Sequence, residues 1–79
     1  MKESKVYQEI MQEGVVAARR ADVAEAITVR FGAEVAAEFQ GALQAVDDAE
    51  RLSELHRLAI RSRKLSELRR GFAAASDRR

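Results

Sequence analysis

The chain has 79 residues, a formal net charge of +1 and no cysteine. A chain this short forms one domain at most and buries only roughly 60% of its unfolded surface, so an isolated copy is marginally stable and self-association would add core. The missing cysteines exclude disulfides and thiolate metal sites and fit a reducing cytoplasm, and no apolar run approaches the roughly 20 residues of a membrane span.

The first predicted helix runs from about residue 5 to 31. Helix is favoured nearly everywhere, because proline is absent and alanine, glutamate and arginine are abundant. Ser4 is the expected N-cap of this helix. Gly32 stands where a C′ residue with left-handed backbone would end it.

Two apolar stripes follow this helix. The first alternates steps of three and four, the spacing of a seam between helices, and consists of Tyr7, Ile10, Gly14, Ala17, Ala21, Ala24, Thr28 and Phe31. The second lies about 100° away, is interrupted by Arg20, and consists of Val16, Val23 and Ile27. Two stripes exceed what one short neighbour covers, so we expect the helix to contact its own chain and another copy. The alternative is that the chain's own helices cover both.

The oligomer contact is expected on the first stripe, because its small residues would let a second helix approach closely. The predicted interface residues are Tyr7, Ile10, Gly14, Ala17, Ala21, Ala24 and Thr28.

Shorter helices are predicted after the long one. The second, about residues 33–46, repeats apolar residues on one face: Val35, Phe39, Ala42, Leu43 and Val46. Asp47 is the expected N-cap of the third helix, about residues 48–61, because Glu50 three positions later completes a capping-box pattern. The inward residues of the third helix are Leu52, Leu55, Leu58 and Ala59.

After a change of phase at residues 62–64, a last short helix is defined by Leu65, Leu68 and Phe72. The expected fold is all-α: one long N-terminal helix followed by two or three short helices in a compact, oligomeric bundle. It forms a single helical domain over residues 4–72, with a frayed tail at 73–79.

No catalytic, metal or cofactor site is expected. Acidic pairs such as Asp47 and Asp48 lie among polar neighbours, whereas a catalytic pair needs burial to separate its two pKa values. His56, the one histidine, has only serines near it in sequence and is interpreted as a flank residue of the third helix. The glycines form no phosphate-binding loop.

Charge is divided unevenly along the chain. Residues 1–56 hold six Lys or Arg against eleven Asp or Glu, a net of −5, while residues 57–79 hold eight against two, a net of +6. This polarity favours contact between copies or with an acidic partner, and the alternative is a solvated charged surface.

Nucleic-acid binding is the second function considered, with phosphate contacts from Arg57, Arg61, Arg63, Lys64, Arg69 and Arg70. The lack of Asn and Gln there disfavours base reading.

Two short motifs carry a family resemblance: Tyr7-Gln8-Glu9-Ile10 leading to Glu13-Gly14, and Arg30-Phe31-Gly32. Over about residues 4–72 the chain resembles the C-terminal helical domain of unknown function that follows the PD-(D/E)XK core in Rpn-type recombination-promoting nucleases and transposase-like proteins. Tyr7, Ile10 and Gly14 match the opening motif, and residues 30–32 match the turn. The resemblance implies a long helix, an RFG turn and then short helices with regularly spaced leucines.

The catalytic half of that family does not carry over, because the chain has no Asp…Glu-x-Lys nuclease pattern. We therefore expect a non-enzymatic oligomerisation or interaction module, a homodimer or larger homo-oligomer. The resemblance implies that it assembles with, or restrains, a relative that bears the nuclease domain. The other hypothesis is a small nucleic-acid-binding domain that uses the basic C-terminal end.

Overall fold

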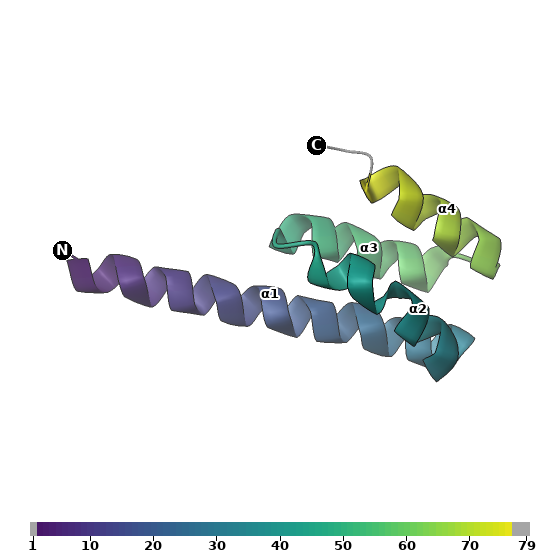
Figure 1. The fold of residues 1–79 in the computed structure, drawn as a ribbon, viewed down its shortest axis with the longest axis horizontal. Helices are drawn as coiled ribbons and strands as arrows, with labels where there is room; N and C mark the ends of the chain where they lie inside the picture. Colours follow the sequence, from purple (N-terminus) through teal and green to yellow (C-terminus); the bar gives the residue numbers. More distant parts are fainter. Residues whose placement is uncertain (1, 77–79) are drawn as a thin grey trace.

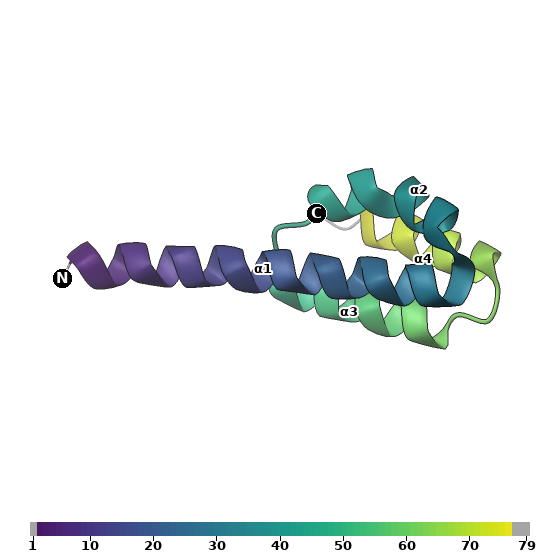
Figure 2. The same ribbon diagram turned by 90° about the horizontal axis from the view of Figure 1, so that it is seen from below.

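The computed structural model describes residues 2–76, with side chains from 13 to 75. Over these residues all regular secondary structure is α-helix, with α1 at Lys2–Phe31, α2 at Ala33–Gln44, α3 at Ala49–Arg61 and α4 at Leu65–Ser76. Figures 1 and 2 show α2, α3 and α4 gathered along the C-terminal part of α1, whose N-terminal part extends beyond them. The prediction of an all-α fold with one long helix followed by short ones is confirmed.

The core collects residues from all four helices around one stripe of α1. Val23 and Ile27, both 0% exposed, come from the second stripe of the long helix. The rings of Phe39 and Phe72 lie 4.5 Å apart between centroids and join α2 to α4. The remaining buried apolar residues are Leu43, Leu52, Leu55, Ala59 and Leu68, all predicted to face inward. Five other predicted inward residues are only partly buried against this core: Val35, Ala42, Val46, Leu58 and Leu65.

A single residue, Gly32, separates α1 from α2. Its N–H donates to the carbonyl of Thr28 at 3.0 Å, and its own carbonyl accepts from Ala36 at 3.1 Å. Its φ of +103° favours glycine, as predicted, but its ψ of 161° lies outside the left-handed helical region expected for a C′ residue. Gly32 therefore closes one helix and opens the next. Ser4 is not the N-cap, because α1 already begins at Lys2.

The start of α3 corrects a second cap. Asp48, rather than Asp47, is the N-cap, and its carboxylate accepts from the N–H of Glu50 at 2.9 Å. The predicted capping box of Asp47 and Glu50 is therefore wrong, because the third helical position now belongs to Arg51. Asp47 instead binds Arg20 of α1, at 2.7 Å between Nη2 and Oδ1. The helix α2 ends at Gln44, two residues before the predicted end, and α4 continues to Ser76.

Three arginines bind carbonyl groups at the C-terminal ends of other helices. Arg20 donates to the carbonyls of Leu43 and Val46 at the end of α2, at 3.0 and 2.8 Å. Arg51 donates to the carbonyl of Ala75 near the end of α4. The last carbonyls of a helix lack partners within it and carry the negative end of its dipole. A guanidinium there donates hydrogen bonds to these carbonyls, and its positive charge interacts favourably with the dipole.

Arg30, the third of these arginines, donates to carbonyls at the end of α3. Its Nη1 lies 2.6, 2.7 and 2.5 Å from the carbonyl oxygens of Ala59, Ile60 and Ser62. These contacts tie the end of α1 to the turn between α3 and α4. The bundle is thus held by a shared apolar core and by arginine contacts at three helix ends.

Candidate interaction surfaces

The first stripe of α1 lies outside the core over the described side chains. Gly14, Ala17, Ala21 and Thr28 are exposed, and Ala24 is half-buried at the edge of the core. Ala24 and Phe31, both partly buried, are the described members of this stripe that pack against the core. The chain's own helices therefore cover the second stripe and leave most of the described first stripe uncovered. The predicted interface residues Tyr7 and Ile10 lie outside the residues whose side chains are described.

An open groove of about 390 Å³ borders the first stripe. Three alanines of α1 form one wall, and the groove is lined by Ala17, Arg20, Ala21, Ala24, Gln40, Leu43 and Gln44. The hydroxyl of Thr28 donates to the carbonyl of Ala24 at 2.8 Å, so it is satisfied within its own helix. This side of α1 offers small and apolar groups that can be covered with little desolvation of polar groups.

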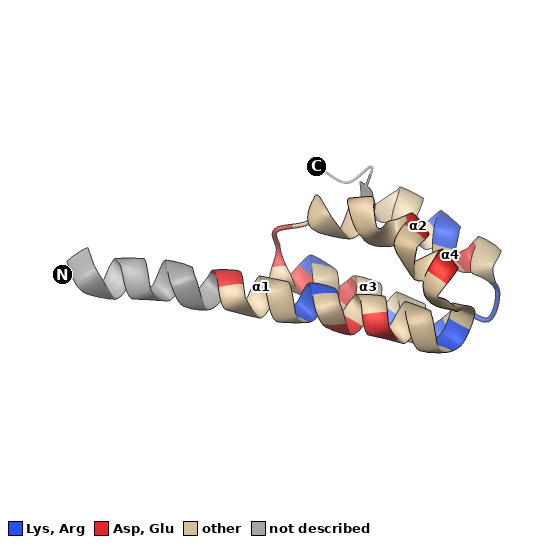
Figure 3. Ribbon diagram, turned by 60° about the horizontal axis from the view of Figure 1, so that its bottom comes forward, with Lys and Arg blue, Asp and Glu red and all other residues tan. Residues whose placement is uncertain are grey.

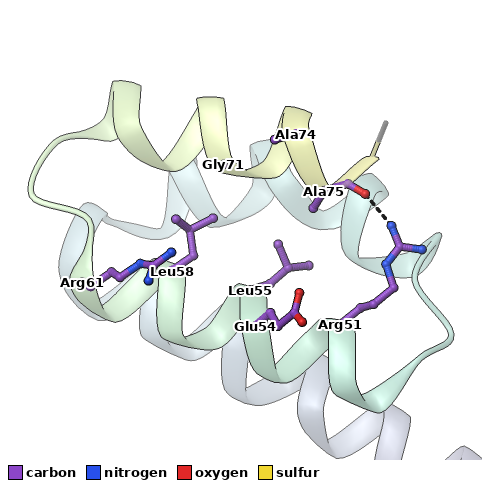
Figure 4. Close-up of a pocket in the computed structure, with 8 residues that line it drawn as sticks. All are labelled: Arg51, Glu54, Leu55, Leu58, Arg61, Gly71, Ala74 and Ala75. Atoms are coloured by element: carbon purple, nitrogen blue, oxygen red, sulfur yellow. Dashed lines mark hydrogen bonds between the residues drawn. The ribbon is translucent and has the colours of Figure 1, made fainter. Parts of the chain in front are cut away.

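A second groove runs between α3 and α4. Figure 4 shows Leu55 and Leu58 between the two helices, with Arg51, Glu54 and Arg61 projecting from α3. Gly71, Ala74 and Ala75 line the α4 side of this groove of about 430 Å³. A Cβ placed on Gly71 would lie 2.3 Å from Cδ2 of Leu58, so glycine lets these helices approach closely here.

The basic end lies around the turn between α3 and α4. Arg57, Arg61, Arg63, Lys64 and Arg70 are exposed, as the nucleic-acid hypothesis requires. Arg69, however, forms a two-pronged ion pair with Glu38 of α2, at 2.7 and 2.9 Å. Figures 1 and 2 show α3 and α4 running antiparallel as a hairpin, whereas the two helices of a DNA-binding helix-turn-helix cross at about 90–120°. The superficial similarity to that motif does not extend to its geometry.

The Glu38–Arg69 pair has a pH-dependent consequence. The hydrogen bond from Arg69, with its positive charge, lowers the pKa of Glu38 below its ordinary value of 4.5. A carboxyl with a lowered folded pKa contributes stability that is present above its unfolded pKa and is lost as the pH falls through the folded pKa. The contribution is modest, because both side chains are about half exposed and solvent screens the pair.

We therefore expect Glu38→Gln to reduce the loss of stability between about pH 5 and pH 2. The measurement is the urea midpoint of the unmodified chain and of the variant at both pH values. The midpoint should fall less in the variant, since it lacks the carboxylate whose protonation breaks the pair. Equal falls in both chains would contradict this role for Glu38.

The described residues bring no catalytic constellation together. No group of three or more His, Cys, Asp or Glu among them is placed to hold a metal ion. Every buried polar side-chain atom in the same part of the chain has a hydrogen-bond partner. Ser62, 1% exposed, donates its hydroxyl to the carbonyl of Leu58 at 2.6 Å, so no base activates it. No helix in the described region is long and apolar enough to cross a membrane.

Comparison with protein-family models, curated proteins and solved structures found no match to this chain. The resemblance to the helical domain of Rpn-type nucleases stays a prediction.

Sequence reasoning missed the role of Arg20, although the signal was present. Arg20 falls in line with Val16, Val23 and Ile27, all of which face the core. A charged residue at such a position must carry its head group to a polar partner, here the end of α2. The identity of that partner depends on tertiary packing, which the sequence pattern does not reveal.

Proposed function

We propose that this chain is a non-catalytic helical module that associates with a second copy through the outer stripe of α1. The observation that carries the proposal is that the two stripes of α1 differ in burial. Its second stripe packs into the chain's own core, while Gly14, Ala17, Ala21 and Thr28 of the first stripe are exposed. A seam of small residues at three-and-four spacing allows the close contact that two helices need.

The size of the domain supports the same proposal. A 79-residue chain leaves a large share of its surface exposed, and covering an α1 face with few charges adds apolar burial at low cost. The groove beside Ala21 provides a concave edge for a second helix. The resemblance adds a nuclease-bearing relative as a proposed hetero-partner for this face, which co-purification of the two chains would test.

Ala21→Glu tests the interface. Each partner would bring a carboxylate into the seam, and burying unpaired charge is strongly unfavourable, so the oligomer should weaken by at least roughly tenfold. The domain itself should keep its helix content, because Ala21 is exposed. Light scattering after size-exclusion chromatography measures the mass, and circular dichroism measures the helix content.

Ala73→Glu is the matched control, since it places the same carboxylate on an exposed alanine of α4. The control should retain the mass of the unmodified chain. If Ala21→Glu and Ala73→Glu have the same mass as the unmodified chain at every concentration, the α1 interface is refuted.

Nucleic-acid binding ranks second among the functions. The exposed arginines and Lys64 near the turn favour it, while the Arg69–Glu38 pair and the hairpin geometry disfavour it. Phosphate contacts are strongest at low salt. If the chain binds duplex DNA at low salt and releases it as the salt concentration rises, nucleic-acid binding becomes the favoured function.

A further inference from the structure

The exposed face of α3 carries a charge pattern that is complementary to itself. Glu50, Glu54, Arg57 and Arg61 follow one another in steps of four, three and four and are all exposed. At about 100° per residue they lie within about 60° of one another on the helix, so they share one face. The two acidic residues occupy the first half of this α3 charge face, and the two basic residues occupy the second half.

Antiparallel pairing of this face with its own copy matches every charge. With a two-fold axis between residues 55 and 56, Glu54 meets Arg57 of the other copy and Glu50 meets Arg61 of the other copy. A parallel arrangement would instead place acid on acid and base on base, which is unfavourable. The pattern therefore selects one orientation.

The turns at the two ends of α3 continue the same match. Figure 3 shows the acidic turn before α3 and the basic turn after it at opposite ends of the helix. Under the same axis, the acidic turn of one copy, with Asp47 and Asp48, lies toward the basic turn of the other, with Arg63 and Lys64. All four residues are exposed; Asp47 keeps 90% of its side chain exposed although it binds Arg20.

Apolar groups flank the charges. Ile60, on the same helix, is 54% exposed, and the groove that contains Leu58 lies on the α4 side, next to Glu54 and Arg61 (Figure 4). Surface ion pairs by themselves hold proteins together weakly and mainly set orientation, so apolar burial beside them adds to the affinity.

We propose that the α3 charge face is a second self-contact surface, on which α3 of another copy packs antiparallel about a two-fold axis. This contact is separate from the α1 seam and stands whether or not α1 pairs. Two distinct two-fold contacts on one chain would build assemblies larger than a dimer.

Two charge-reversed chains test the contact. One carries Glu50→Arg and Glu54→Arg, so its face is wholly basic; the other carries Arg57→Glu and Arg61→Glu, so its face is wholly acidic. Both also carry Ala21→Glu, which removes any α1 contact. Each chain alone should repel its own copy, and the equimolar mixture should associate at least roughly tenfold more tightly than either alone.

Sedimentation of each chain and of the mixture measures these affinities, and added salt should weaken the mixed complex. A mixture that associates no more tightly than its separate components would overturn the proposal. The α1 interface is judged separately, by Ala21→Glu in the otherwise unmodified chain.

A second pair of variants keeps the test valid if the doubly reversed chains fold poorly. Exchange of Glu54→Arg together with Arg57→Glu preserves net charge and the antiparallel match, whereas Glu54→Arg alone places a positive charge opposite Arg57 of the other copy. In the Ala21→Glu background, the exchanged chain should associate as tightly as the parent, and the single variant roughly tenfold more weakly. If the exchanged chain and the single variant lose the same affinity for their own copies, the proposed contact is also overturned.

Discussion

Replacing Ile27 by alanine should lower the free energy of unfolding by about 2–5 kcal/mol. Ile27 is 0% exposed and lies in the shared core, so the substitution removes buried apolar atoms and leaves a cavity. Chains of this size have a total stability of only about 4–12 kcal/mol, so the variant should be close to unfolding. Urea unfolding followed by circular dichroism measures the change.

The adjacent residue provides the control. Thr28→Ala changes an exposed position of the same helix, and its hydroxyl bonds only to the carbonyl of Ala24. We expect a change within about 0.5 kcal/mol. Similar losses from the two substitutions would contradict the assignment of one stripe to the core and the other to the outer surface.

Arg20→Met should cost about 1–3 kcal/mol, because it removes the guanidinium that donates to the carbonyls of Leu43 and Val46 at the end of α2. The Arg20 side chain is only 20% exposed, so solvent replaces these bonds poorly. Methionine keeps the length of the apolar stem and removes the donors. The measurement is again the free energy of unfolding in urea.

Arg19→Met removes the same charge from the neighbouring exposed residue. It should change the stability by no more than about 0.5 kcal/mol. Equal effects at the two arginines would show that charge, rather than the binding of helix-end carbonyls, accounts for the loss.

Most of the fold was predictable because its signals are local. Apolar residues at helical spacing marked Phe39, Leu52 and Leu68 as core, and all three are buried. Gly32 marked the break between the first two helices, since a positive φ suits glycine. Periodicity and glycine conformation require no knowledge of tertiary structure.

The features that were missed depend on contacts between distant residues. The sequence favours Asp47 as the N-cap of α3, because Glu50 lies three residues after it. In the fold Asp48 caps α3, and Asp47 binds Arg20, 27 positions away along the chain. The ends of α2 and α3 likewise receive Arg20 and Arg30 from α1, a pairing that no local pattern encodes. Helix ends are less predictable than helix cores for this reason.

The candidate surfaces were predictable in part. The sequence identified the small-residue stripe at Ala17 and Ala21, but only the fold shows that the chain's own core leaves these residues exposed. The uneven charge was visible in the sequence, yet the self-complementary order of Glu50, Glu54, Arg57 and Arg61 acquires meaning only with a defined, exposed face of α3.

Sedimentation equilibrium of the unmodified chain at micromolar concentration tests the central claim, self-association, most directly. We predict a mass of two or more 79-residue chains that falls toward that of one chain on dilution. A folded chain that sediments with the mass of a single copy throughout this range would contradict the claim.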